Sequence, residues 1–445
     1  MASPLPDHPL STPPARVCRV SLPFLLPVTP QAFVSACGRV VVPIRRCRWG
    51  PRHGRAERAM SRRSGRIPSK AERLFLHYLD PAADDAVVDL FGGDAALAVA
   101  VVQRIPAGHL TVLTRDAAVH AALQRHIRQV GAANATVVLA ASAAALPVGT
   151  FDLAYVVVRP YLSGSQLTDL LAGARRCLRP GGRLLLMAGM RQGAATAMQR
   201  AEELFGNLRI LDKPGGTRIA SCVAGGAMAP SNRGGERAQA EIRFDVRLRG
   251  QTFTFLSAGG IFSRGAVDDG THLLLETVDV RPADRIADVG CGYGVIGIVA
   301  ARCAPVGHVT LVDSDALAVE LARRNIALNG VGNAEALVSD GLAAVHDRSF
   351  DLVLSNPPLH AGERTLRRLT EEAYDHLVPG GRLVYVVHKA YDARPMLTAV
   401  FGAATTLAET REFRVVSGTR GMVIAHGTAD AVLHVGGPLV QRQKA

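Results

Sequence analysis

The sequence contains one pattern twice in register, and this repeat limits the fold more than any other feature. Four short segments recur 199 residues later in the chain: 86–90 and 285–289, 109–113 and 308–312, 151–153 and 350–352, 180–184 and 379–383. Several matches at one offset, without net insertion, indicate a duplicated unit. We therefore predict that the chain is a tandem duplication.

Each copy alternates short Val/Leu/Ile-rich runs with amphipathic segments such as residues 316–329. This alternation is typical of βαβ units that form a parallel sheet covered by helices on both faces. With 445 residues, the chain also exceeds the roughly 250–300 at which a single core stops growing. We predict an α/β protein with a Rossmann-like fold in each copy. The expected segments are a first domain at 61–224, a Gly-rich polar linker at 225–240, a second domain at 241–435 and a tail at 436–445.

The first sixty residues differ from the rest of the chain. They are rich in Pro, contain nine Arg against only Asp7 and Glu57, and show neither helical nor strand periodicity. We expect residues 1–60 to be a disordered basic extension or a misassigned start, and we favour a true start at Met60. A basic RNA-binding arm is the rival interpretation. A transit peptide is disfavoured because no sustained amphipathic helix is present.

Composition restricts the partners and the compartment. The formal net charge of +13 suits a polyanion such as RNA. Seven scattered cysteines, none in a CxxC pair, indicate a reducing compartment, and we expect a cytoplasmic protein without disulfides or a metal. Four prolines and two arginines interrupt the apolar stretch 17–44, so we expect no membrane span. We further expect a monomer.

A glycine-dense turn follows the first predicted strand of the second copy, at residues 288–297 (DVGCGYGVIG). Glycines let the backbone bend sharply and approach a ligand closely. Asp313 closes the next strand, 25 residues after Asp288, where a carboxylate can accept hydrogen bonds from two ribose hydroxyls. This spacing fits S-adenosylmethionine and NAD equally, and such a turn also occurs without a ligand. Asp340, at the end of the third strand, is either an acceptor for an adenine amino group or a solvated loop acid.

The sequence Ser355-Asn356-Pro357-Pro358 follows the hydrophobic strand 350–354. Two prolines fix φ and remove two backbone donors, which leaves carbonyl acceptors beside the Asn side chain. Such a group of acceptors suits an –NH2 group. Asn-Pro-Pro can also simply end a strand, but its position after the Gly-rich turn and Asp313 favours an amine site.

With these motifs in place, the second copy resembles the methyltransferase small domain family. It is most similar to the ribosomal RNA guanine-N2 methyltransferases, which also duplicate the fold. The upstream segment GGIFSR at 259–264, then Asp268 and GTHLLL at 270–275, match the same proteins. The resemblance implies a class I methyltransferase fold, S-adenosylmethionine as cofactor, and ribosomal RNA or a ribosomal subunit as partner.

The motifs and the resemblance together give a set of candidate residues. The candidate catalytic residues are Asn356 and Pro357. The candidate cofactor-binding residues are Asp288, Gly290, Gly292, Gly294, Asp313 and Asp340. The candidate substrate-binding residues are Pro358, Leu359, His360 and Phe262. The family usually has an aromatic residue where this chain has Leu359, and base stacking contributes roughly 1–3 kcal/mol, so this departure leaves the identity of the base open.

The first copy lacks nearly all of these side chains. At the same offset, the counterparts of Gly290, Gly294, Asp313, Asp340 and Asn356 are Phe91, Ala95, Thr114, Ala141 and Val157. A ring at position 91 would occupy the space where the backbone must approach a cofactor, and valine accepts no amine proton. We therefore predict a degenerate first copy, kept for structure or for holding RNA.

Other functions remain open at this point. One is a methyltransferase for a glutamine side-chain amide in a translation factor, and another is a DNA adenine-N6 enzyme. A third is a non-catalytic RNA-binding or ribosome assembly protein with a vestigial cofactor site. An NAD-dependent oxidoreductase is the weakest, because that chemistry has no need of Asn-Pro-Pro.

Overall fold

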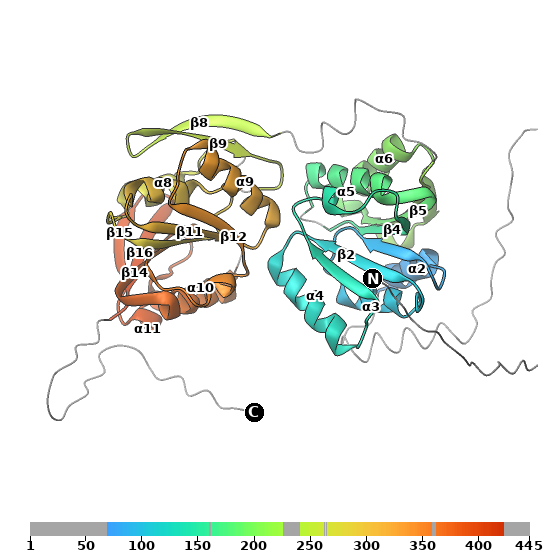
Figure 1. The fold of residues 1–445 in the computed structure, drawn as a ribbon, viewed down its shortest axis with the longest axis horizontal. Coiled ribbons are helices and arrows are strands. Elements are labelled where there is room, and N and C mark those ends of the chain that lie inside the picture. Colours follow the sequence, from blue (N-terminus) through green and yellow to red (C-terminus); the bar gives the residue numbers. More distant parts are fainter. Residues whose placement is uncertain are drawn as a thin grey trace, which may run out of the picture. The chain divides into compact units, whose positions relative to one another are not determined.

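The computed structural model describes residues 69–159, 162–225, 241–261, 263, 265–357 and 362–421 (Figure 1). The predictions for residues 1–60, for the tail at 436–445, and for the linker beyond Gly225 lie outside these residues. Among the described residues, no helix is both long and apolar enough to cross a membrane.

The first copy contains a seven-stranded sheet in the order β3-β2-β1-β4-β5-β7-β6. Its strands are β1 (Ala86–Asp89), β2 (His109–Thr114), β3 (Ala135–Leu139), β4 (Phe151–Val157), β5 (Leu178–Gly189), β6 (Arg209–Asp212) and β7 (Thr217–Val223). Its helices are α2 (Lys70–Leu79), α3 (Ala95–Val102), α4 (Ala117–Gln129), α5 (Gly164–Cys177) and α6 (Ala194–Phe205). Strands β1–β5 are parallel, whereas β7 pairs antiparallel with β5 and β6.

The second copy repeats this topology in a sheet ordered β12-β11-β10-β13-β14-β16-β15. Its strands are β10 (Arg285–Val289), β11 (His308–Asp313), β12 (Ala334–Val338), β13 (Phe350–Ser355), β14 (Leu377–His388), β15 (Thr405–Glu409) and β16 (Phe413–Thr419). Its helices are α7 (Asp269–Thr277), α8 (Val295–Cys303), α9 (Ala316–Leu328), α10 (Gly362–His376) and α11 (Arg394–Phe401). An antiparallel hairpin of β8 (Ile242–Leu248) and β9 (Gln251–Ser257) precedes it.

The two copies match element by element. Strands β2 and β11, helices α4 and α9, strands β3 and β12, and strands β5 and β14 are each 199 residues apart. The offset then shortens to 196 between β7 and β16, so three residues are missing from the second copy after β14. The predicted fold class, a duplicated Rossmann-like α/β fold, is confirmed.

Helices cover both faces of each sheet, as the near-continuous apolar strands require. In the second copy, Ile286 and Leu352 pack with α7, α8 and α9, whereas Ala287 and Val353 pack with α10 and α11. Successive residues of a strand point to opposite faces, so β10 and β13 contribute to both layers. Both strands are buried toward their carboxyl ends, which fixes where those ends lie.

The two copies contact each other through equivalent loops, 115–117 and 314–316. The last residue of each loop donates its N–H to the carbonyl of the first residue of the other, at 2.8 and 2.9 Å. Between these bonds, Asp116 and Asp315 form an antiparallel bridge. Residue 117 bonds to residue 314 in the same way as its equivalent, residue 316, bonds to residue 115. The contact therefore has local two-fold pseudosymmetry.

Candidate active site

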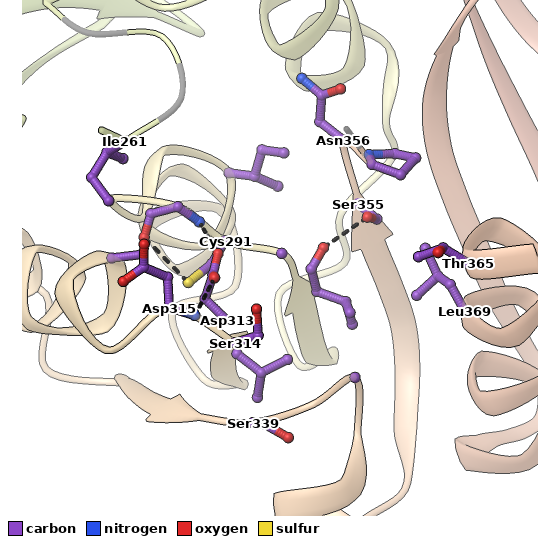
Figure 2. A pocket seen from close by; sticks show the side chains of 18 of the residues that line it. Ile261, Cys291, Asp313, Ser314, Asp315, Ser339, Ser355, Asn356, Thr365 and Leu369 are labelled. Carbon is purple, nitrogen blue, oxygen red and sulfur yellow. Dashed lines mark hydrogen bonds between the residues drawn. The ribbon is translucent and has the colours of Figure 1, made fainter. Parts of the chain in front are cut away.

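A cavity of about 660 Å³ lies at the carboxyl ends of β10, β11 and β13. This is where ligands bind in open α/β sheets, and the volume falls in the range of roughly 300–1,000 Å³ found for small-molecule sites. Six of the candidate residues line it: Gly290, Gly292, Asp313, Asp340, Asn356 and Pro357. Figure 2 shows several of the lining side chains, from Asp313 to Asn356.

The turn after β10 exposes its backbone to the cavity. Gly290 and Gly292 have φ angles of 74° and 55°, in the left-handed region that glycine adopts without strain. A Cβ atom at either position would meet no protein atom within 4 Å. Since both residues line the cavity, a side chain there would extend into space that a ligand can use.

Asp313 is fixed at the end of β11 by two backbone hydrogen bonds. Its Oδ2 accepts from the N–H of Gly292 at 2.8 Å, and its Oδ1 accepts from the N–H of Asp315 at 2.9 Å. Burial raises the pKa of the Asp313 carboxyl, and these two hydrogen bonds oppose that shift. Each oxygen keeps a lone pair for a further donor, as a ribose-binding carboxylate needs.

Asp288 and Gly294, which were predicted to contact the cofactor, are absent from the cavity wall. Asp288 is fully buried, and its Oδ2 accepts from the N–H of Gly297 in the first turn of α8 at 2.8 Å. A Cβ atom at Gly294 would lie 3.1 Å from Ile298 and 3.2 Å from Leu311. Both residues therefore shape the turn and its packing, and the prediction of direct contact finds no support in this geometry.

The carboxyls of Asp288 and Asp313 lie close enough to affect each other's ionisation. Burial raises the pKa of Asp288 to about 7, with a further rise from the charge of Asp313, against the hydrogen bond from Gly297. Oδ1 of Asp288 is buried without a hydrogen-bond partner among the described residues. A positively charged ligand in the cavity would stabilise the ionised form of both carboxylates.

Asp340 lines the cavity but is already paired with Arg368 of α10. The guanidinium Nη1 lies 3.2 Å from Oδ2 of Asp340, and Nε lies 3.3 Å from Glu372 one turn along the helix. The hydrogen bond to Asp340 raises the pKa of Arg368. An adenine amino group would therefore share Asp340 with an ion pair that the sequence analysis did not anticipate.

Asn356 stands at the end of β13, beyond Ser355 (Figure 2). Ser355 anchors the strand end by donating its hydroxyl to the carbonyl of Val289 at 2.7 Å. The Asn356 Nδ2 donates to Oγ1 of Thr271 at 2.9 Å and to Oδ1 and Oδ2 of Asp268 at 3.1 and 3.3 Å. With Nδ2 held in this way, the amide oxygen is left as the acceptor end of the side chain.

Asp268 and Thr271 are functional candidates that the sequence analysis missed. Both line the cavity, yet they precede Asn356 by 88 and 85 residues. Their only signal in the sequence was the segment from Asp268 to residue 275, to which the resemblance gave no role. The candidate substrate residues Phe262, Pro358, Leu359 and His360 lie outside the described residues.

The first copy also contributes to the cavity wall, through Asp116 and Ala118. Oδ2 of Asp116 accepts a hydrogen bond from the Ser314 hydroxyl at 3.1 Å. Asp116 was not predicted from the sequence, and it occupies the position in the first copy that Asp315 occupies in the second.

The equivalent site of the first copy is closed. Its cavity measures about 30 Å³ and is lined by Phe91 and Thr114, the counterparts of Gly290 and Asp313. That volume holds no more than a few water molecules. This geometry supports the predicted degeneration of the first copy, since a cavity of that size has no room for a nucleoside-sized ligand.

Comparison with known proteins gives the family. The model of the methyltransferase small domain matches residues 64–221 and again residues 252–417. The ribosomal RNA small subunit methyltransferase C of Pseudomonas aeruginosa is 33% identical over 259 residues, which is 57% of this chain and 76% of that protein. The Stutzerimonas stutzeri protein of the same name is 33% identical over 280 residues, 62% of this chain and 81% of its own length.

A solved structure agrees with these relatives. The 16S rRNA N2 methyltransferase of T. thermophilus, in complex with AdoMet and guanosine, superposes with a TM-score of 0.67 at 25% identity. The match covers 78% of this chain and 91% of that one. The chain therefore belongs to the methyltransferase small domain family, with both copies of its duplicated fold.

Proposed function

We propose that the second copy transfers a methyl group from S-adenosylmethionine to the exocyclic N2 amine of a guanine in small-subunit ribosomal RNA. The observation that carries this proposal is Asn356, whose Nδ2 is held by Asp268 and Thr271 while its oxygen remains to accept. The names of the relatives support the substrate, and the T. thermophilus protein was solved with both AdoMet and guanosine.

The residues of the cavity fit the cofactor. The open backbone at Gly290 and Gly292 admits a ligand closely, and the Asp313 carboxylate can accept from ribose hydroxyls. Asp313 lines the cavity, and a positively charged ligand there would favour the ionised form of its carboxyl. When bound, S-adenosylmethionine supplies a methyl group activated by a positively charged sulfur.

The residues at the end of β13 would prepare the amine. In guanine the lone pair of the exocyclic nitrogen is delocalised into the ring. Hydrogen bonds from its two protons to Oδ1 of Asn356 and to the carbonyl of Pro357 would favour a tetrahedral nitrogen and direct its lone pair. The same oxygens would stabilise the positive charge that the nitrogen gains, so that catalysis rests on positioning and preorganised dipoles.

The substrate must present the base unpaired. A base stacked inside a helix cannot enter a cavity at the end of a sheet, so the target lies in a loop or is flipped out. The basic net charge suits RNA. We further propose that the protein acts in the cytoplasm as a monomer, since the described residues that line the cavity all come from one chain.

Incubation with radiolabelled S-adenosylmethionine and a panel of acceptors tests the proposal. The panel contains small and large ribosomal subunits, free ribosomal RNA, a translation release factor and DNA. We expect label in the small-subunit RNA, as free RNA or in the subunit. Label in the release factor would favour the glutamine-amide function, and no transfer to any acceptor would favour a non-catalytic RNA-binding role.

A further inference from the structure

We propose that Asp268 and Thr271 are positioning residues that fix the orientation of the Asn356 amide and strengthen its oxygen as an acceptor. This inference rests on the proposed function, since it assigns to the amine site two residues that do not themselves touch the amine. Both come from the start of α7, which is distant in sequence from the Asn-Pro-Pro motif.

The two residues are held rigidly by the helix that they begin. Asp268 is the N-cap of α7, and its Oδ1 accepts from the N–H of Thr271 at 3.0 Å. Thr271 is only 5% exposed. An N-cap carboxylate and a buried hydroxyl on the first turn have little freedom to move. The three hydrogen bonds from Asn356 Nδ2, at 2.9 to 3.3 Å, therefore end on a fixed surface.

This surface selects one of the two orientations of the amide. If the Asn356 side chain turned over, its oxygen would face the Asp268 carboxylate, and two acceptors would meet without a proton between them. The Nδ2 group would then face the cavity and repel the protons of the incoming amine. A carboxylate is an acceptor only, so Asp268 enforces the productive orientation more strongly than a neutral residue could.

The charge of Asp268 has a second effect. A hydrogen bond from an amide N–H to a carboxylate is charge-assisted, and hydrogen bonds in a chain polarise one another. Electron density withdrawn from the Nδ2 protons accumulates on Oδ1 of Asn356. That oxygen then accepts more strongly from an amine whose nitrogen is becoming positive.

The first copy provides an internal control. The counterparts of Asp268, Thr271 and Asn356 are Ser69, Glu72 and Val157. Ser69 and Glu72 form a capping box within α2, with bonds of 2.7 and 3.2 Å. The equivalent helix of the first copy is thus capped by a different pair of residues, and both Asp268 and Thr271 are replaced in the copy where the asparagine is also replaced.

Five variants of the full chain test the inference, with methyl transfer to small-subunit RNA as the assay. Asp268→Ala and Thr271→Val should each lower kcat about 10- to 100-fold, the loss typical when a group that orients a site residue is removed. Thr271→Ser keeps the hydroxyl and should restore most of the activity that Thr271→Val loses. Asp268→Asn keeps a capping oxygen without the charge and should fall between wild type and Asp268→Ala. Asp269→Asn, at the exposed neighbouring acid, is the matched control and should match wild type.

Readouts other than turnover separate positioning from general structure. The affinity for S-adenosylmethionine, measured by calorimetry, and the midpoint of thermal unfolding should change little in Thr271→Val and Asp268→Asn. Adding Asp268→Ala to Asn356→Ala should not lower kcat further, because the two residues act through one group.

The outcomes distinguish this inference from the proposed function. If Asn356→Ala keeps its turnover, the amine site itself is wrong. If Asn356→Ala is inactive while Asp268→Ala and Thr271→Val keep normal kcat, only the positioning role is overturned. The positioning role is also overturned if the loss of kcat is accompanied by equal losses of cofactor affinity and stability. The same holds if Thr271→Ser does not restore the kcat that Thr271→Val loses.

Discussion

Asn356, Asp313 and Asp288 end three neighbouring strands of the second sheet, and each has a different environment. Asn356 has its donor end held, Asp313 accepts two backbone N–H groups, and Asp288 is enclosed behind the turn. A polar side chain at each strand end was expected from the sequence. The sequence did not predict which of these side chains reach the cavity, because that depends on the turn that covers Asp288.

Asn356→Ala should lower turnover strongly and leave cofactor binding unchanged. The substitution removes the acceptor for one amine proton, and loss of one such preorganised group lowers kcat by about 100- to 1,000-fold. Single-turnover assays and calorimetry with S-adenosylmethionine separate the two effects. A variant with a near-normal rate would contradict the assignment of the amine site.

Asp313→Ala should have the opposite profile. The hydrogen bonds of a charged group contribute about 1.5–3 kcal/mol, so we expect cofactor affinity to fall on the order of 10- to 100-fold. The rate at saturating cofactor should change less. Asp347→Ala, at an exposed acid, is the control, and equal affinities in the two variants would exclude a cofactor role for Asp313.

The buried carboxyl of Asp288 should make stability depend on pH. Its pKa rises from 3.8 to about 7 on folding, so the folded state binds the proton more tightly and the free energy of unfolding falls as pH rises through this window. Asp288→Asn removes this dependence. The free energy of unfolding of the variant, compared with that of wild type, should therefore be higher at pH 8 than at pH 5. Urea unfolding at pH 5 and pH 8 measures these free energies. If the difference between variant and wild type is the same at both pH values, ionisation of Asp288 does not contribute to stability.

At the level of elements, the glycine-rich turn and α8 form one unit. The N-cap Gly294 offers no side chain, and Asp288 accepts from the first turn of the helix instead. Asp288 has a counterpart in the first copy, Asp89, which also accepts backbone N–H groups at its turn. A residue kept where the cofactor site is lost serves the turn, which the sequence alone did not separate from ligand binding.

Replacing two glycines of this unit by alanine should affect different properties, stability in one case and cofactor affinity in the other. A Cβ at Gly297 would lie 2.4 Å from the side chain of Leu311, and such overpacking costs about 1–3 kcal/mol. Gly290→Ala meets no protein atom but lines the cavity, so it should weaken cofactor binding more than its backbone strain of about 1–2 kcal/mol weakens folding. Thermal unfolding and calorimetry on both variants give the comparison, and identical profiles would contradict the assignment of Gly290 to the cavity.

For the whole molecule, the duplication was predictable and the contacts between distant segments were not. The repeat at an offset of 199 residues predicted two α/β units with parallel strands, but it did not predict the antiparallel strands β6, β7, β15 and β16 at one edge of each sheet. The pairing of Asp340 with Arg368, the bonds from Asn356 to α7 and the place of Asp116 on the cavity wall join residues far apart in sequence. Hydrophobic periodicity carries no information on such side-chain contacts.

One cofactor molecule should bind per chain. The cavity of the first copy holds about 30 Å³ against about 660 Å³ in the second. Calorimetry should therefore give a stoichiometry of one, and Thr114→Ala should leave the affinity unchanged where Asp313→Ala lowers it. A second binding event, or equal effects of the two variants, would show that the first copy is not degenerate.

Identifying the methylated nucleoside tests the proposed chemistry most directly. Small-subunit RNA incubated with the protein and S-adenosylmethionine is digested to nucleosides and analysed by liquid chromatography and mass spectrometry. We predict N2-methylguanosine with the wild-type protein and none with Asn356→Ala. Methylation at a ring nitrogen, at adenine N6 or at a ribose hydroxyl would contradict an Asn356 site built for the guanine amine.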